Sequence, residues 1–339
     1  MKIAVLAVGS KTGEQGGAER FYLGLTNALN AEGAYADLIN VMSDESSFEA
    51  IEETLLHFYD LDLTHYDGVI STKAPSYLVR HSNHICYLVH TMRVFYDMFD
   101  GEYPLAGETL QKQRDLIRKI DTFALSPPST RKVFTIGNEV RNRLLRFIGI
   151  DCEVIYPSIT SDSFYCNSYE HVFLPGRLHR WKRVSLIIEA MKYVRSPVRL
   201  IIAGAGEDEE QLKLLAIQDD RITFAGRVSD AELMSLYADA LCVPFVPIRE
   251  DLGLVTIEAF KSSKPVITCV DSGEPTYFVK HEETGFICDP IPSEIAKWID
   301  FLHDHQDIAK AMGERGKQSV RHICWEDVAT RLITALDAG

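Results

Sequence analysis

Residues 241–263 read LCVPFVPIREDLGLVTIEAFKSS, and this stretch indicates the fold class. Its first five residues form a short apolar run, which predicts a buried strand over 241–245. From Gly253 onward the apolar residues recur at helical spacing, so a helix is expected over 253–263. An apolar strand that leads through a loop into a helix is typical of parallel sheets covered on both faces.

The same alternation of strand and helix continues on both sides of this stretch. In the second half of the chain, further strands are predicted at 172–174, 199–203, 222–224, 265–268 and 285–287, and helices at 182–194, 208–218 and 230–238. In the first half, strands are predicted at 2–8, 35–40, 68–71, 85–89, 122–125 and 153–156, and helices at 18–33 and 109–120.

The pattern restarts after a polar stretch at 158–170, which indicates a domain boundary. A chain of 339 residues is also too long for one ordinary core. We therefore predict an α/β protein of two doubly wound, Rossmann-like domains facing a cleft, over residues 1–160 and 161–322. Residues 323–339 are expected to form a C-terminal helix that packs back on the first domain. Ligands of such sheets bind at the carboxyl ends of the strands.

Composition excludes several classes of protein. The net charge of −14 argues against a general nucleic-acid binder, because phosphate backbones attract surplus Lys and Arg. The seven cysteines are scattered without a CxxC pair, which favours reduced thiols and a cytoplasmic location. Residues 1–10 are apolar but short, and are interpreted as a buried strand instead of a signal peptide. No apolar run approaches the roughly 20 residues that a membrane span needs.

One stretch departs from the acidic average. Residues 112–147 hold nine Lys and Arg side chains against three acidic ones. The first interpretation is a solvated helix face. The second is a surface that meets anionic lipid or an anionic acceptor, which would place the protein peripherally at the inner face of a membrane.

Two glycine-containing loops resemble anion-binding helix starts. Residues 9–20 carry Gly16 and Gly17 directly before an apolar helix, where backbone N–H groups lack helical partners and the helix dipole favours anions. Arg177 follows the predicted strand at 172–174, and Lys182 is expected at the start of the next helix. Arg offers a planar fork and Lys a point charge, and together they suit a diphosphate.

Two further strand ends complete the candidate site. Gly204 follows the strand at 199–203, but the third glycine of a dinucleotide fingerprint is missing, so NAD binding is not expected. Gly253 can start the next helix, so that the amides of Leu254 and Val255 face a phosphate. Glu258 on that helix could accept from the paired hydroxyls of a ribose, and Glu250 in the preceding loop would lie nearer a sugar.

These residues are similar to the motifs of a known enzyme family. The spacing of Glu250 and Glu258 resembles the E-x7-E motif of retaining GT-B glycosyltransferases, the large family that contains sucrose-phosphate synthases and bacterial mannosyl- and glucosyltransferases. Further resemblances follow in the family's order along nearly the whole chain. They are Gly16-Gly17-Ala18-Glu19-Arg20, Pro175-Gly176-Arg177-Leu178 with Lys182, Phe224-Ala225-Gly226-Arg227-Val228, Glu283-Thr284-Gly285-Phe286 and Trp325-Glu326.

The resemblance implies a role for each of these positions. The first domain would bind the acceptor and the second the nucleotide sugar. His90, after the predicted strand at 85–89, would face the donor sugar, and the Thr91-Met92-Arg93 that follows it departs from many relatives. Arg227 and Val228 would lie at the nucleobase, which the backbone holds.

The implied reaction is retaining transfer of a hexose from a nucleoside-diphosphate sugar to a glycan or lipid-linked acceptor, in bacterial polysaccharide biosynthesis. UDP-glucose is the favoured donor and GDP-mannose the alternative. No cofactor or metal is expected, because Asp60-Leu61-Asp62 lies in an acidic, surface-like stretch. Arg177, Lys182 and two helix starts would instead stabilise the leaving diphosphate. A nucleotide-sugar epimerase of the same fold and a non-catalytic nucleotide-binding module are the competing interpretations.

Overall fold

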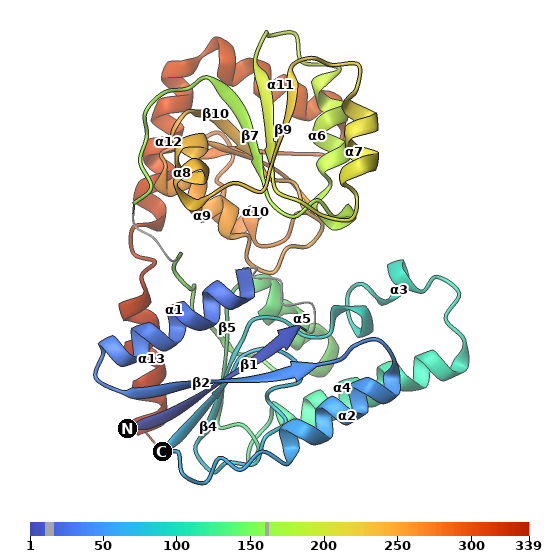
Figure 1. The fold of residues 1–339 in the computed structure, drawn as a ribbon, viewed down its shortest axis with the longest axis vertical. Helices are drawn as coiled ribbons and strands as arrows, with labels where there is room; N and C mark the ends of the chain where they lie inside the picture. The colour runs from blue at the N-terminus through green and yellow to red at the C-terminus, as the bar shows by residue number, and fades with distance from the viewer. Residues whose placement is uncertain (11–16, 160–162, 339) are drawn as a thin grey trace. The chain divides into compact units, whose positions relative to one another are not determined.

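The computed structural model describes residues 1–10, 17–159 and 163–338, which divide into two compact units. Unit 1 comprises Met1–Thr160 together with Ile323–Gly339, and unit 2 comprises Ser161–His322. Each unit is an α/β structure built on a six-stranded sheet (Figure 1). The prediction of two doubly wound, Rossmann-like domains is confirmed.

Unit 1 has the strand order β2-β1-β3-β4-β5-β6, and its strands pair in parallel. Its strands are β1 (Lys2–Ser10), β2 (Tyr35–Ser43), β3 (Gly68–Ser71), β4 (His84–Leu88), β5 (Lys132–Thr135) and β6 (Glu153–Val154). Its helices are α1 (Gly17–Ala31), α2 (Phe48–Tyr59), η1 (Arg93–Phe95), α3 (Phe99–Glu102), α4 (Glu108–Ala124), α5 (Asn138–Ile148) and α13 (Trp325–Asp337).

The last helix of the chain completes unit 1. In Figure 1, α13 lies beside α1, and it also contacts β4. The Trp325 ring packs so closely on α1 that a Cβ at Gly24 would lie 2.6 Å from it. Asn83 donates to the carbonyl oxygen of Leu336 at 3.2 Å. Glycine at position 24 therefore lets two helices from opposite ends of the sequence approach closely.

Unit 2 has the strand order β12-β11-β10-β7-β8-β9, again with parallel pairing. Its strands are β7 (His171–Pro175), β8 (Arg199–Ala203), β9 (Ile222–Gly226), β10 (Ala240–Pro244), β11 (Val266–Cys269) and β12 (Gly285–Cys288). Its helices are η2 (Arg180–Lys182), α6 (Val184–Met191), α7 (Glu209–Ala216), α8 (Asp230–Ala238), α9 (Leu254–Lys261), α10 (Pro275–Phe278), α11 (Pro292–Asp304) and α12 (Gln306–Val320).

This strand order creates a topological switch point between β7 and β10. The chain proceeds from β7 to β8 on one side and later returns to β10 on the other. The loops that leave the carboxyl ends of these two strands therefore diverge to opposite faces of the sheet. Ligands of open α/β sheets bind at such a point.

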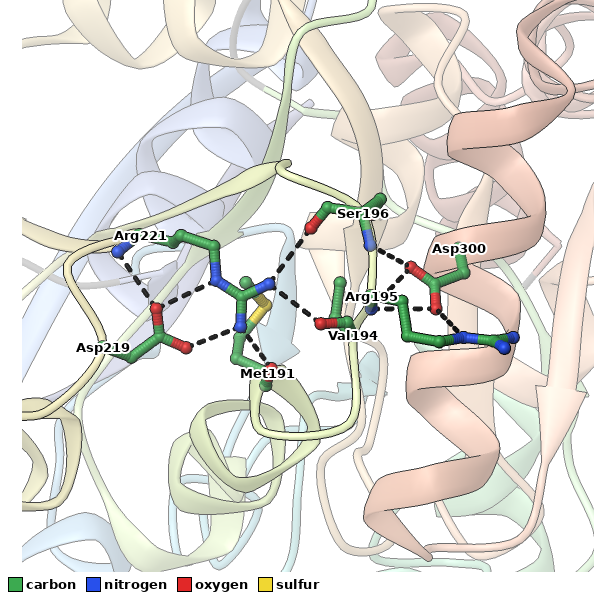
Figure 2. A network of polar contacts seen from close by, with 7 residues as sticks. All are labelled: Met191, Val194, Arg195, Ser196, Asp219, Arg221 and Asp300. Atoms are coloured by element: carbon green, nitrogen blue, oxygen red, sulfur yellow. Dashed lines mark hydrogen bonds and ion pairs between the residues drawn. The ribbon is translucent and has the colours of Figure 1, made fainter.

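The opposite, amino-terminal edge of this sheet is fastened by Arg221, which directly precedes β9. Its guanidinium makes two hydrogen bonds to the Asp219 carboxylate, of 2.9 and 2.7 Å (Figure 2). It also donates to three backbone carbonyl oxygens, that of Met191 at the end of α6 and those of Val194 and Ser196 in the connection to β8. The contacts join the segment before β9 to the segment before β8.

Two local predictions are wrong. Residues 122–125, expected as a strand, are the last turn of α4 and its cap. Ile117, Asp121 and Ala124 are buried there while Phe123 is 65% exposed, which is the spacing of a helix. The strand lies instead at Lys132–Thr135, between β4 and β6.

Lys182 is the second correction, because it ends the 3-10 turn η2 and α6 begins only at Val184. Arg183 lies between them in the left-handed conformation, with φ 51°, and this backbone cannot continue a right-handed helix.

Candidate active site

The loops after β7, β8 and β9 are joined by backbone hydrogen bonds. The N–H of Gly176 donates to Ala203 at 2.9 Å, and that of Gly204 donates to Gly226 at 2.7 Å. Gly204 has φ 136°, and a Cβ there would lie 1.9 Å from the Gly176 carbonyl oxygen. Only glycine permits this approach, so Gly204 fixes the geometry of the strand ends.

Arg177 leaves this junction with an exposed side chain. Its Nη2 lies 3.5 Å from Oε1 of Glu207, and the same oxygen lies 3.2 Å from Nε2 of His179. A hydrogen bond from its own backbone N–H, then the charges of Arg177 and His179, lower the pKa of Glu207. Glu207 was not assigned a role from the sequence, because its partner Arg177 lies 30 positions earlier in the chain.

Lys182 and Glu250 meet at the switch point. Nζ of Lys182 lies 2.5 Å from Oε2 of Glu250, and both side chains are partly buried, with exposed fractions of 30% and 21%. The ammonium also lies 5.6 Å from the centroid of the Phe245 ring. The loops that carry the two residues follow β7 and β10, which are neighbours in the sheet. The structure thus brings together two residues that are 68 positions apart.

Gly253 caps the helix that begins beside this pair. It has φ 76°, and a Cβ there would lie 2.7 Å from the Phe245 ring and 3.3 Å from Cγ of Glu250. Leu254 and Val255 form the first turn of α9, where backbone N–H groups have no acceptor within the helix. The positive end of α9 therefore starts next to the Lys182 and Glu250 pair.

Glu258 lies on the second turn of α9 and accepts a hydrogen bond from Tyr237 of α8, at 2.7 Å. Tyr237 is fully buried and packs edge-on against Phe173 and Phe164. Burial, and then the Glu258 charge, raise the pKa of Tyr237 well above its ordinary value, so the hydroxyl remains a donor. Tyr237 was not identified from the sequence, since a buried tyrosine in a helix looks like an ordinary core residue.

Arg227 and Val228 follow β9, at the same carboxyl-terminal edge of the sheet. The Arg227 side chain is exposed and Val228 is half-buried. Of the N-terminal loop, Gly17 opens α1, whereas Gly16 lies outside the described residues.

His90 belongs to unit 1, two residues after β4. Its Nδ1 lies 2.6 Å from the Thr91 carbonyl oxygen, and its own carbonyl accepts from the N–H of Ala74 at 3.2 Å. The residue is half-buried, and Thr91 is fully buried. His90 is thus anchored at the carboxyl end of a strand of the first sheet, as predicted.

Most cations of the basic stretch 112–147 have local partners within unit 1. Arg143 is buried against Asp97, with Nε to Oδ1 at 2.7 Å, and Arg118 donates to the Phe95 carbonyl. Further pairs are Lys112 with Glu108, Arg114 with Asp115, Arg131 with Asn83, Lys132 with Glu153, and Arg141 with Asp151. These cations come from α4, α5 and the region of β5.

Within the described ranges, no group of three or more His, Cys, Asp or Glu side chains is arranged to hold a metal ion. Asp60 caps the end of α2, and Asp62 accepts hydrogen bonds from Thr64. Metal independence stays a prediction. In the same part of the chain, none of the helices has the length and apolar character that crossing a membrane requires.

Solved structures of known proteins share this architecture over its full length. Sucrose-phosphate synthase from Thermosynechococcus elongatus superposes with a TM-score of 0.78 at 19% identity, covering 99% of this chain and 98% of that one. Anabaena HepE in complex with UDP-glucose gives a TM-score of 0.74 at 15% identity, covering 100% of both chains. The chain therefore has the fold of the GT-B glycosyltransferases.

The family match is narrower and lies in unit 2, where residues 167–319 match the glycosyl transferases group 1 family. Human alpha-1,3/1,6-mannosyltransferase ALG2 is 30% identical over 204 residues, which are 51% of this chain and 49% of that protein. The chain thus matches about half the length of this curated relative. The matched family domain contains Arg177, Lys182, Glu250 and Glu258.

Proposed function

We propose that this chain is a retaining glycosyltransferase that moves a hexose from a nucleoside-diphosphate sugar to a glycan or lipid-linked acceptor. The observation that carries the proposal is the Lys182 and Glu250 pair at the switch point of unit 2, beside the N-terminus of α9. An ammonium and a positive helix end suit a diphosphate, while the adjacent carboxylate suits sugar hydroxyls.

Breaking the bond between sugar and phosphate leaves a nucleoside diphosphate with growing negative charge. Arg177, Lys182 and the amides of Leu254 and Val255 would stabilise that charge, each such contact being worth about 3 kcal/mol in a closed site. Glu258, held by Tyr237, would bind the ribose, and Arg227 and Val228 would lie at the base. Glu250 and His90 would orient the sugar.

Retention without a carboxylate nucleophile favours attack from the face that the diphosphate leaves. The leaving phosphate oxygen would accept the proton of the acceptor hydroxyl as the new glycosidic bond forms. No step in this route needs a metal ion or a cofactor. Full activity in the presence of excess EDTA is the expected result, and activity that EDTA abolishes and Mg²⁺ restores would refute it.

UDP-glucose is the first donor to test, because HepE, which shares the fold, was solved with it. GDP-mannose is the second candidate, because human ALG2, a relative that matches 51% of this chain, is a mannosyltransferase. Thermal unfolding with UDP, GDP and their sugars separates the two. A nucleotide at 100 times its Kd stabilises the folded protein by about 2.7 kcal/mol. A larger shift with GDP than with UDP would reverse the donor assignment.

The anomeric configuration of the product tests retention. We expect nuclear magnetic resonance of the first product to show the α configuration of the donor sugar. A β product contradicts the proposal, and interconversion of two nucleotide sugars without transfer would identify an epimerase. Binding of a nucleotide with neither reaction would identify a non-catalytic module.

A lipid-linked acceptor would bring the protein to a membrane surface. Leu116 and Phe123 of α4 are exposed, and they share one helix face with Lys112 and Lys119 at spacings of four, three and four residues. Such a face suits an anionic bilayer. Leu116→Glu with Phe123→Glu should abolish sedimentation with anionic vesicles, and unchanged sedimentation would remove this surface from the proposal.

A further inference from the structure

Arg183 adopts a backbone conformation that is unfavourable for its residue type. It has φ 51° and ψ 40°, in the left-handed region that a side chain with a Cβ rarely enters. It lies between Lys182 and the first residue of α6. Strain of this kind persists where the surrounding contacts enforce it, and it is concentrated at functional sites.

The contacts that hold Arg183 come from two other loops. Its Nε donates to the Val246 carbonyl oxygen at 2.6 Å, and Nη2 donates to that of Pro247 at 2.9 Å. Both terminal nitrogens also bind the Asp271 carboxylate, at 2.8 and 2.7 Å. The side chain, only 14% exposed, therefore ties the loop after β7 to the loops after β10 and β11.

The loop that Arg183 holds is the loop that carries Glu250. Backbone hydrogen bonds hold the same loop. The N–H groups of Ile248, Arg249 and Glu250 donate to the carbonyl oxygens of Trp181, Asp271 and Ser272, respectively. Lys182, the neighbour of Arg183, binds the far end of this loop through the Glu250 carboxylate. Two consecutive residues thus fix the loop at its start and at its end.

We propose that Arg183 is a positioning residue, which sets the place of Glu250 and Lys182 for the transfer reaction. This inference rests on the proposed function of the same site. Arg183 itself binds Val246, Pro247 and Asp271. It would affect the reaction only by holding the loop that carries Glu250. Small displacements of a positioned group can slow an enzyme about 100-fold, so the loss of this attachment should be visible in the rate.

Arg183→Gly is the informative variant. Glycine adopts the left-handed conformation without strain, so the backbone path is kept while the guanidinium is removed. Relief of strain offsets part of the lost bonding, and we expect a melting temperature within about 4 °C of the wild type. The kcat for transfer should fall by about 10-fold to 100-fold, with a smaller change in the KM for the donor.

Arg221→Ala is the matched control. Arg221 also forms a two-bond pair with a carboxylate and binds backbone carbonyls, but at the opposite edge of the same sheet (Figure 2). Its loss should lower the melting temperature of unit 2 and leave kcat within about twofold. A purely structural role for Arg183 would make the two variants behave alike.

Asp271→Ala removes the carboxylate that Arg183 binds. Because both residues act through one attachment, the double variant should lose hardly more rate than Arg183→Gly alone. If the fold-loss in kcat of the double variant equals the product of the losses in the two single variants, the assignment is overturned.

Amide hydrogen exchange tests the attachment without any substrate. The amides of residues 246 and 248–250 should exchange faster in Arg183→Gly than in the wild type or in Arg221→Ala. Unchanged exchange there, or faster exchange with an unchanged kcat, overturns the positioning role. A wild-type protein that neither binds nor consumes any nucleotide sugar refutes the proposed function itself, and the positioning role with it.

Discussion

At the scale of single residues, the Lys182 and Glu250 pair has two proposed roles. The ammonium would bind the diphosphate, and the carboxylate would bind the sugar. The pair is 2.5 Å long and lies beside the first turn of α9. A carboxylate in this place would repel a diphosphate unless the ammonium neutralised it. The pairing would therefore let a carboxylate that binds the sugar lie next to the proposed diphosphate site.

This division makes a prediction for Glu250→Gln. The variant keeps the shape of the side chain but loses its charge, so kcat should fall about 100-fold, as for other lost transition-state contacts. Free UDP lacks the transferred hexose, and calorimetry should show its affinity within about threefold of the wild type. Glu207→Gln, at the exposed pair with Arg177, is the control and should change kcat little. An equal loss of UDP affinity and kcat would move Glu250 from the sugar to the nucleotide.

Asp121 gives a second prediction, for the pH dependence of stability. This carboxyl group is buried in unit 1 and accepts from the Tyr96 hydroxyl at 2.6 Å. Burial raises its pKa from 3.8 to about 6, against the opposing effect of hydrogen bonds. Between these values the folded state binds the proton and the unfolded state does not. The unfolding free energy therefore falls as pH rises through this window, by about 3 kcal/mol in total.

Asp121→Asn should remove this dependence, because the side-chain amide does not ionise in this pH range. Urea unfolding should show the variant gaining stability relative to the wild type between about pH 4 and pH 6.5. Asp62→Asn is the control with the opposite sign, since hydrogen bonds from Thr64 lower the pKa of exposed Asp62. A difference between Asp121→Asn and the wild type that does not vary with pH would contradict the assigned cause.

At the scale of elements, the ends of the strands in unit 2 depend on backbone contact between loops. Gly204 shows the dependence, because its Cβ position is occupied by the Gly176 carbonyl. We expect Gly204→Ala to destabilise unit 2 by about 3 kcal/mol or more, through both overpacking and strain. Gly226→Ala is matched to it, since Gly226 also has positive φ but no atom within 4 Å of its Cβ position.

The Gly226→Ala variant should therefore be destabilised only by the strain of an alanine backbone at positive φ, which is about 1 kcal/mol. Guanidinium unfolding of the two variants measures both costs. Equal destabilisation would show that contact with Gly176 does not limit residue 204.

The elements that sequence could predict are those with unambiguous periodicity. Buried strands such as β3 and β8 are continuous apolar runs, and they lie at the predicted residues. The error at 122–125 has a physical cause, because four residues are too few to distinguish a strand from a helix turn. The strand at Lys132–Thr135 was not predicted.

The site was predictable where chemistry lies in one loop, and not where it depends on contacts between loops. Glu250, Gly253 and Glu258 lie within one strand–loop–helix unit, so their spacing was informative. The partners came from distant positions: Tyr237 is 21 residues from Glu258, and Asp271 is 88 residues from Arg183. No local pattern reports such a contact. The assigned roles in catalysis and donor binding stay predictions.

At the scale of the whole molecule, unit 1 is made from both ends of the described chain. Val328, Leu332 and Leu336 of α13 are almost fully buried, and Trp325 packs on α1. Burial of an apolar side chain of this size contributes about 2 kcal/mol, so the three buried ones amount to about 6 kcal/mol. A typical domain is stable by only about 5–15 kcal/mol. The helix therefore decides whether unit 1 folds.

Removal of residues 323–339 should lower the melting temperature of unit 1 by tens of degrees, given this magnitude. Unit 2 has its own core and should keep its thermal transition, which calorimetry can resolve. Trp325→Ala is the milder variant and should lower only the unit 1 transition. Loss of both transitions on truncation would show that the two units unfold together.

The place of α13 also affects the order of events during synthesis. A ribosome releases the chain from its first residue onward, and domains usually fold in that order. Here the sheet of unit 1 is translated first, but its covering helix begins only at Trp325, after unit 2 is complete. Unit 2 can therefore reach its native state before unit 1. Until α13 is made, the surfaces of α1 and β4 that it contacts are uncovered, so a chaperone that shields them would have its greatest effect after unit 2 is synthesised and before α13 is complete.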